Sequence, residues 1–194
     1  MSYIIFPKFR IRLSIFALPT FALMLWLEGA FGFFALIASA LLHELGHVFA
    51  IKLCGYRVRR IDILPMGALI VVPEGMPDFC EFIIALSGPA VSLVFGIVSV
   101  LGFYATESVK ILFFGFISLV LGMFNVMPIK KLDGGKALLS LMRHRKIKNA
   151  DRISACAHVI SLLLVVFVLS LCYLLSSCNL GVLILSLALV LQLG

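Results

Sequence analysis

The sequence predicts an all-α polytopic membrane protein with about six transmembrane helices and a short membrane-associated β-hairpin-like segment between the second and third. Three observations predict this class. Hydrophobic residues make up 63% of the 194-residue chain and charged residues only 13%, against about 45–50% and 25% in soluble proteins. The mean hydropathy is +1.20. The apolar residues also fall into runs of membrane-spanning length, so we expect one membrane-embedded domain over residues 1–194, without a soluble regulatory domain.

The apolar runs define the six predicted spans, because a membrane-crossing helix needs about 20 apolar residues. In order, these spans are residues 13–27, 30–53, 83–104, 111–127, 153–175 and 178–193. The last two come from the stretch 153–194, which contains no Asp, Glu, Lys or Arg. As a single helix that stretch would be about 63 Å long, twice the thickness of a bilayer core. It must therefore fold back, and residues 176–179 are the predicted turn.

The basic residues predict the orientation of these spans. If the N-terminus is cytoplasmic, every Lys and Arg except Lys110 falls in an inside segment. The positive-inside rule then predicts a multi-pass integral membrane protein with both termini in the cytoplasm. Topology and anionic lipid explain the formal charge of +7, so no nucleic-acid partner is expected.

The second span carries an unexpected polar cluster. Within the run LLHELGHVFA, residues 41–50, His43, Glu44 and His47 interrupt an otherwise apolar helix. A charged side chain at mid-membrane costs roughly 2.5–3.5 kcal/mol on insertion scales, which favours a functional role over a chance match. On a helix, two histidines four residues apart share one face and can hold a metal ion, while Glu44 points about 100° away, where a general base can reach the attacking water. We expect one Zn²⁺ per chain, although these ligand types also accept other metals.

A third ligand must come from elsewhere, and the sequence leaves several candidates. His144 lies in a basic loop and is most simply a solvated residue, whereas His158 is placed to pack between helices. Asp133 is the stronger candidate, because it lies in NVMPIKKLDGG, residues 125–135, where the fourth span ends. Asp133 is also a suitable N-cap for a short helix, and the two roles are compatible.

Depth in the membrane supports the region around Asp133. His43 is 13 residues from the outer end of the second span, and Asn125 is 14 residues from the outer end of the fourth. At about 1.5 Å per residue, both lie roughly 20 Å from the outer face. Pro128 favours unwinding at this depth, which is tolerated where the backbone lines an enclosed or aqueous cavity.

Together these motifs resemble the site-2 proteases, polytopic zinc metalloproteases that cleave within or near the membrane. The resemblance rests on HELGH, on the pattern N-x-x-P-x-x-x-L-D-G formed by Asn125, Pro128, Leu132, Asp133 and Gly134, and on Ser87-Gly88-Pro89. It covers residues 41–135. In size and core organisation the chain most resembles the compact branch that includes the bacterial sporulation-factor processing protease.

The resemblance implies a role for each motif residue. His43, His47 and Asp133 would be the zinc ligands, Glu44 the general base, and Asn125 a polar group that steadies the developing oxyanion. Pro128 and Gly134 would shape the chain at the site. The segment IDILPMGALIVV, residues 61–72, would offer a strand edge to an unfolded substrate, although an ordinary interfacial hairpin has the same turn signals.

Two departures from the family pattern affect these expectations. Lys130 and Lys131 stand where the family usually has apolar or proline residues, so access for acidic substrate segments is expected to differ. The chain also carries no PDZ or CBS domain of the kind that regulates many relatives. A regulator or substrate adaptor is therefore expected to be a separate protein.

The sequence thus favours an intramembrane zinc endopeptidase that cuts a membrane-associated protein near the cytoplasmic side, with the prokaryotic plasma membrane as the location that the resemblance implies. The alternative is a divalent-metal transporter or a metal-stabilised scaffold without catalysis. Glu44 distinguishes the two, because a carboxylate beside the ligands has a chemical task only in hydrolysis.

Overall fold

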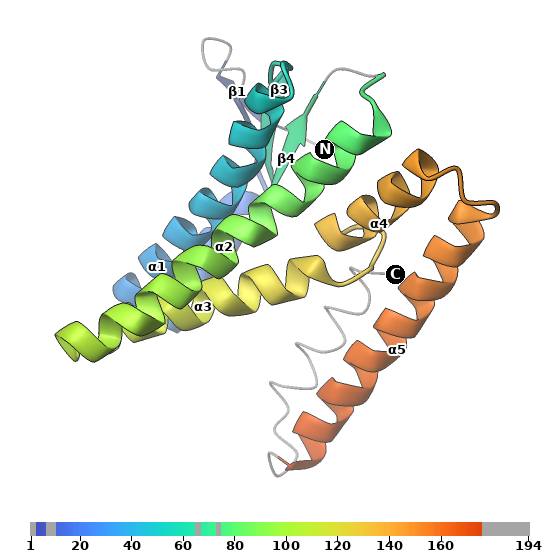
Figure 1. Cartoon of the computed structure of the whole chain (residues 1–194). Coiled ribbons are helices and arrows are strands. Elements are labelled where there is room, and N and C mark those ends of the chain that lie inside the picture. The colour runs from blue at the N-terminus through green and yellow to red at the C-terminus, as the bar shows by residue number, and fades with distance from the viewer. Residues whose placement is uncertain (1–2, 7–10, 65–66, 73–74, 176–194) are drawn as a thin grey trace.

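The computed structural model describes residues 3–6, 11–64, 67–72 and 75–175, and these residues form five helices and four strands (Figure 1). The predicted sixth span, residues 178–193, lies outside the described residues. In chain order the elements are β1 Tyr3–Phe6, β2 Ile11–Ser14, α1 Ala17–Leu53, β3 Arg60–Leu64, β4 Gly67–Val71, α2 Asp78–Thr106, α3 Val109–Val126, α4 Asp133–His144 and α5 Ala150–Leu175.

Four of the described helices are long and apolar enough to cross a membrane, namely α1, α2, α3 and α5. They contain the second, third and fifth predicted spans and all but the last residue of the fourth. Large hydrophobic side chains on these helices remain exposed, among them Phe49 at 63% and Leu101 at 62%. Such extensive apolar exposure is expected where lipid covers the surface, and the chain is an integral membrane protein.

The first predicted span, residues 13–27, is not confirmed as a helix of its own. Its first residues belong to strand β2, and the helix that follows is the first arm of α1, residues 17–28. At about 1.5 Å per residue that arm is about 18 Å long, shorter than the roughly 30 Å of a bilayer core. Hydropathy alone could not separate strand from helix here, because both are apolar.

Helix α1 folds back on itself at Gly29. This residue has φ 69° and ψ 174° inside the helix, a conformation that glycine adopts readily. The rings of Phe21 and Phe33 lie 6.3 Å apart, although twelve residues of straight helix would separate them by about 18 Å. Strand β2, which precedes α1, also pairs with β3, which follows it. The two ends of α1 therefore lie at the same sheet.

The four strands form one sheet in the order β1-β2-β3-β4. β2 and β3 run parallel, with Arg12 opposite Asp62, while β3 and β4 form an antiparallel hairpin in which Ile63 is opposite Ala68. The hairpin predicted between the second and third spans is thus present. β1 and β2 were not predicted as strands. β4 is the last strand of the sheet, so its outer edge has no partner strand among the described residues.

The helices approach closely through small residues. A Cβ on Gly46 of α1 would lie 2.7 Å from the Ser87 carbonyl oxygen of α2, and the hydroxyls of Ser39 and Ser118 are 3.0 Å apart between α1 and α3. Small residues and buried hydroxyl pairs are common at helix interfaces in membranes. The backbones of α1 and α2 are therefore in close contact near His43, Glu44 and His47.

Candidate metal centre

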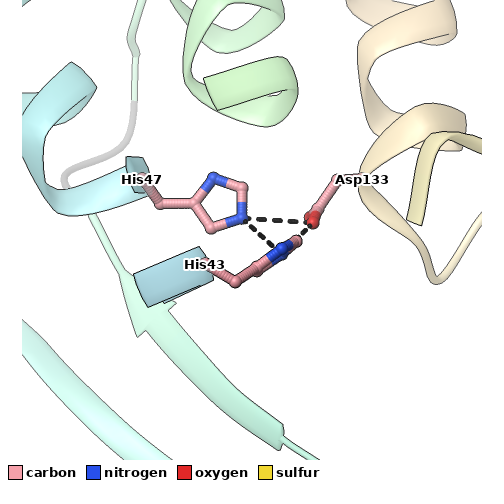
Figure 2. Close-up of side chains that lie close together, drawn as sticks. All are labelled: His43, His47 and Asp133. Carbon is pink, nitrogen blue, oxygen red and sulfur yellow. Dashed lines mark hydrogen bonds and ion pairs between the residues drawn. The ribbon is translucent and has the colours of Figure 1, made fainter. Parts of the chain in front are cut away.

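The structure brings the three predicted ligands together (Figure 2). His43 and His47 extend from one face of α1, and Asp133 is the first residue of α4. Asp133 Oδ2 lies 3.0 Å from His43 Nε2 and 3.1 Å from His47 Nε2, and the two Nε2 atoms are 3.2 Å apart. All three residues are buried. Residues 86 to 90 positions apart in the chain thus converge on one point.

The second nitrogen of each ring is held by α2. His47 Nδ1 donates to the Ile84 carbonyl oxygen at 2.7 Å, and since a carbonyl only accepts, this nitrogen carries a proton. His43 Nδ1 lies 3.0 Å from the hydroxyl of the buried Ser92. These contacts fix the orientation of both rings, and the two Nε2 atoms face the carboxylate. In metal-binding histidines, a hydrogen bond to the second ring nitrogen commonly has this effect.

The donor set fits zinc. Around a tetrahedral zinc ion with bonds of about 2.0–2.1 Å, ligand atoms lie about 3.3 Å apart, close to the three distances given above. Two imidazole nitrogens and a carboxylate oxygen can all donate electron pairs to a cation once the Nε2 atoms are deprotonated. Three protein ligands also leave the fourth position that a catalytic zinc site keeps open.

The surroundings of Asp133 favour the ionised carboxylate, which is the form that binds a metal ion. Burial raises its pKa, but the contacts with His43 and His47 outweigh burial and hold the pKa well below the usual range. The ammonium of Lys136 contributes in the same direction, with its Nζ 3.2 Å from Oδ1. Asp133 is therefore an anion at neutral pH, as a metal ligand must be.

The chain between α3 and α4 positions Asp133 next to the two histidines. Helix α3 ends at Val126, Pro128 follows, and the N-cap of α4 is Leu132 rather than Asp133. The N-cap role considered for Asp133 is thus wrong, because Asp133 is the first helical residue and no side-chain hydrogen bond caps the helix. A Cβ on Gly134 would collide with the Val126 carbonyl. Glycine at 134 lets α4 start against the end of α3.

Glu44 lies beside the cluster and faces the sheet. Its half-buried carboxylate interacts with the backbone N–H of Ala68 in β4. The edge strand therefore runs next to the predicted general base. No sequence signal predicted this contact, because the pairing of the hairpin with α1 depends on the fold.

The other predicted polar residues lie apart from the three ligands. Asn125 is in the last turn of α3, where its Nδ2 donates to the Leu121 carbonyl oxygen at 3.0 Å. His144 packs against the ring of Phe79. His158 accepts a hydrogen bond of 3.3 Å from the backbone N–H of Lys130, so it supports the loop that leads to Asp133. This support was not predicted, since nothing in the spacing relates His158 to that loop.

The family model for peptidase family M50 matches residues 31–111 and 104–168, which is most of the chain. The chain belongs to peptidase family M50. The predicted resemblance to site-2 proteases is confirmed. The chain is similar in structure to a site-2 protease from Methanocaldococcus jannaschii, with a TM-score of 0.67 and 27% identity over 96% of this chain and 91% of that one.

Two M50-type relatives show the extent of the sequence similarity. A zinc metalloprotease of Methanocaldococcus jannaschii is 31% identical over 120 residues, 57% of this chain and 34% of that protein. Stage IV sporulation protein FB of Bacillus subtilis is 30% identical over 134 residues, 60% of this chain and 45% of that protein. The chain thus spans between a third and a half of the length of these relatives.

Ser92 is expected to support the M50 metal centre without touching the metal. In Ser92→Ala, His43 loses the partner of its Nδ1, and its ring is no longer held in the ligand orientation. We expect zinc affinity to fall by about 10–100-fold, the usual cost of losing such a contact. Competition with a zinc chelator measures this. Ser99→Ala, two turns along α2, is the matched control, and equal affinities in the two variants would contradict the role of Ser92.

Gly88 of the Ser-Gly-Pro element provides the space for His47. A Cβ at this position would collide with the imidazole, including Nε2 itself. Gly88→Ala is therefore expected to displace His47 and lower zinc affinity by at least about tenfold, the lower end of the cost of disturbing a ligand's surroundings. Gly102→Ala in the same helix is the control, because its Cβ would meet only Ile111 Cγ2 at 3.8 Å. Wild-type zinc affinity in Gly88→Ala would rule out this steric argument.

Proposed function

We propose that this protein is an intramembrane zinc endopeptidase that hydrolyses peptide bonds of a membrane-associated protein. One observation carries the proposal: three convergent zinc ligands lie beside a carboxylate that interacts with the backbone of the edge strand β4. The ligands alone would suit a transporter or a scaffold. The adjacent Glu44 and the strand edge add a base and a place for an extended substrate.

The site residues take separate tasks in this proposal. When bound to His43, His47 and Asp133, zinc acts as a Lewis acid that makes water nucleophilic near neutral pH. Glu44 accepts a proton from the attacking water as the water oxygen bonds to the scissile carbonyl carbon. Glu44 then passes that proton to the amide nitrogen as the C–N bond breaks, which leaves a carboxylate and an amine. The side-chain amide of Asn125 has a second N–H besides the one that donates to Leu121. We propose that this N–H donates a hydrogen bond to the developing oxyanion.

The edge of β4 explains how a membrane segment becomes cleavable. In a helix, each peptide carbonyl is hydrogen-bonded and shielded, so the substrate must unwind first. Unwinding in lipid leaves backbone groups without partners, which is costly. A segment that adds to β4 regains hydrogen bonds from the strand. Since Ala68 of β4 already meets Glu44, the added segment would lie beside the base.

For the topology, we propose that both termini are cytoplasmic and that the site lies nearer the cytoplasmic side. The register of Arg12 opposite Asp62 supports a common side for the N-terminal basic residues and those after α1. Residues 178–193 are proposed as a further crossing. We also propose a prokaryotic plasma membrane as the location and a separate regulator or adaptor protein as a partner.

Purified full-length protein tests the function directly. We expect about one zinc per chain by elemental analysis, and cleavage of a membrane-tethered peptide in liposomes with the cut mapped by mass spectrometry. 1,10-Phenanthroline should abolish cleavage, and added zinc should restore it. Bound zinc without cleavage, combined with zinc flux across the liposome membrane, would overturn the proposal in favour of transport.

A further inference from the structure

A pocket of about 310 Å³ lies between the end of α1 and the start of β3, next to the sheet and separate from the metal ligands. We call it the basic pocket. Its polar lining consists of Lys52, Tyr56, Arg57 and Arg60, and Val48 and Ile61 contribute apolar wall. No aspartate or glutamate lines it. The composition favours an anion that also carries apolar groups.

The charge of the basic pocket is only partly balanced by the protein. Arg60 Nε donates to Oδ2 of the buried Asp62 at 3.0 Å, so this guanidinium is largely neutralised. Within the described part of the chain, Lys52 and Arg57 form no ion pair, and both are exposed. Two cations therefore face the pocket without a counterion. A phosphate group would supply the missing negative charge.

The surface beside the pocket favours one kind of phosphate-bearing molecule. On α1, an exposed apolar stripe recurs every fourth residue and ends beside Lys52. Its members are Leu41, Leu45, Phe49 and Leu53, which are 58%, 58%, 63% and 71% exposed. This spacing places them on one face of the helix. A lipid with its acyl chain along this stripe would have its headgroup at the level of Lys52. Tyrosine and lysine are typical of the membrane–water interface, where lipid headgroups lie.

We propose that the basic pocket binds the headgroup phosphate of an anionic phospholipid, with Lys52 and Arg57 as the main contacts and an acyl chain along the apolar stripe of α1. Clustered cations between elements at a membrane face are known to bind anionic headgroups. The bound lipid bridges α1, which carries His43 and His47, to the loop that leads into strand β3. This inference goes beyond the proposed function and requires only that α1 lies in a bilayer.

Lipid binding can be measured without proteolysis. Full-length protein carrying Glu44→Gln is placed in nanodiscs of phosphatidylcholine with or without phosphatidylglycerol, and native mass spectrometry counts the lipids that stay bound. We expect phosphatidylglycerol to be retained at least tenfold over phosphatidylcholine. The double variant Lys52→Gln/Arg57→Gln should lose this preference. Arg145→Gln/Lys148→Gln removes the same charge from exposed positions outside the pocket and should keep it.

Each other outcome overturns the proposal. Equal loss in both double variants would mean diffuse attraction to positive charge. Displacement of phosphatidylglycerol by millimolar inorganic phosphate, with phosphate itself retained, would assign the pocket to a soluble anion. Unchanged lipid binding in Lys52→Gln/Arg57→Gln, with weaker cleavage of acidic peptides when Glu44 is restored, would assign it to the substrate. Unchanged zinc content in both double variants checks that they are folded.

Discussion

Replacing Glu44 by glutamine is expected to stop peptide-bond cleavage and to leave zinc bound. Glutamine has nearly the same shape, but its amide cannot take a proton from the attacking water. Loss of a general base typically costs about 10²–10⁴-fold in rate. The three ligands do not include Glu44, so the zinc content should stay near one per chain. Elemental analysis and the rate of cleavage of one membrane-tethered peptide measure the two effects together.

Glu28→Gln is the matched control for this experiment. It makes the same chemical change in α1, next to the reversal at Gly29 and sixteen residues from Glu44. Zinc content and cleavage rate should both stay at the wild-type level. Wild-type cleavage by Glu44→Gln would exclude Glu44 as the base and remove the main argument for hydrolysis.

Replacing Asp133 by asparagine is expected to release the metal and abolish cleavage with it. The change removes the negative charge that two imidazoles and Lys136 now surround, and a neutral amide oxygen is a weaker zinc ligand. Zinc affinity should fall by more than the roughly 10–100-fold that loss of a supporting contact costs. Chelator competition measures affinity, and cleavage at saturating zinc shows how much activity remains.

Asp151→Asn provides the control for charge removal. Asp151 pairs with Arg143 at 3.0 Å on the surface, with 79% of its side chain exposed, and an exposed pair contributes little. Its zinc affinity should equal that of the wild type. If Asp133→Asn also kept wild-type affinity, then the third ligand would be a different residue.

The metal centre could be predicted because two ligands lie close together in the sequence and the third lies at a similar depth in the membrane. His43 and His47 share a helix face by their spacing alone, and the depth argument placed the loop around Asp133 at the same level. Ser92 could not be predicted, because a serine in an apolar helix has many roles and nothing in its spacing identifies the histidine it meets. Only the packing of α2 on α1 does so.

The N-terminal region shows the limit of hydropathy. Residues 13–27 are apolar enough for a span, but the chain divides them between β2 and a short helical arm. Gly29 was the only local signal of the reversal, and a single glycine within an apolar run is common in membrane helices. The sheet decides the outcome, because β2 pairs with β3, which comes some fifty residues later.

The chain separation within the metal centre also sets the time at which activity can arise during synthesis. His43 and Asp133 are 90 positions apart, so the histidines emerge from the ribosome long before the carboxylate. At about 5–20 residues per second the delay is on the order of ten seconds. During that interval α1 can enter the membrane with an incomplete ligand set. Under the proposed function, a nascent chain is therefore inert towards its neighbours until α4 begins to form.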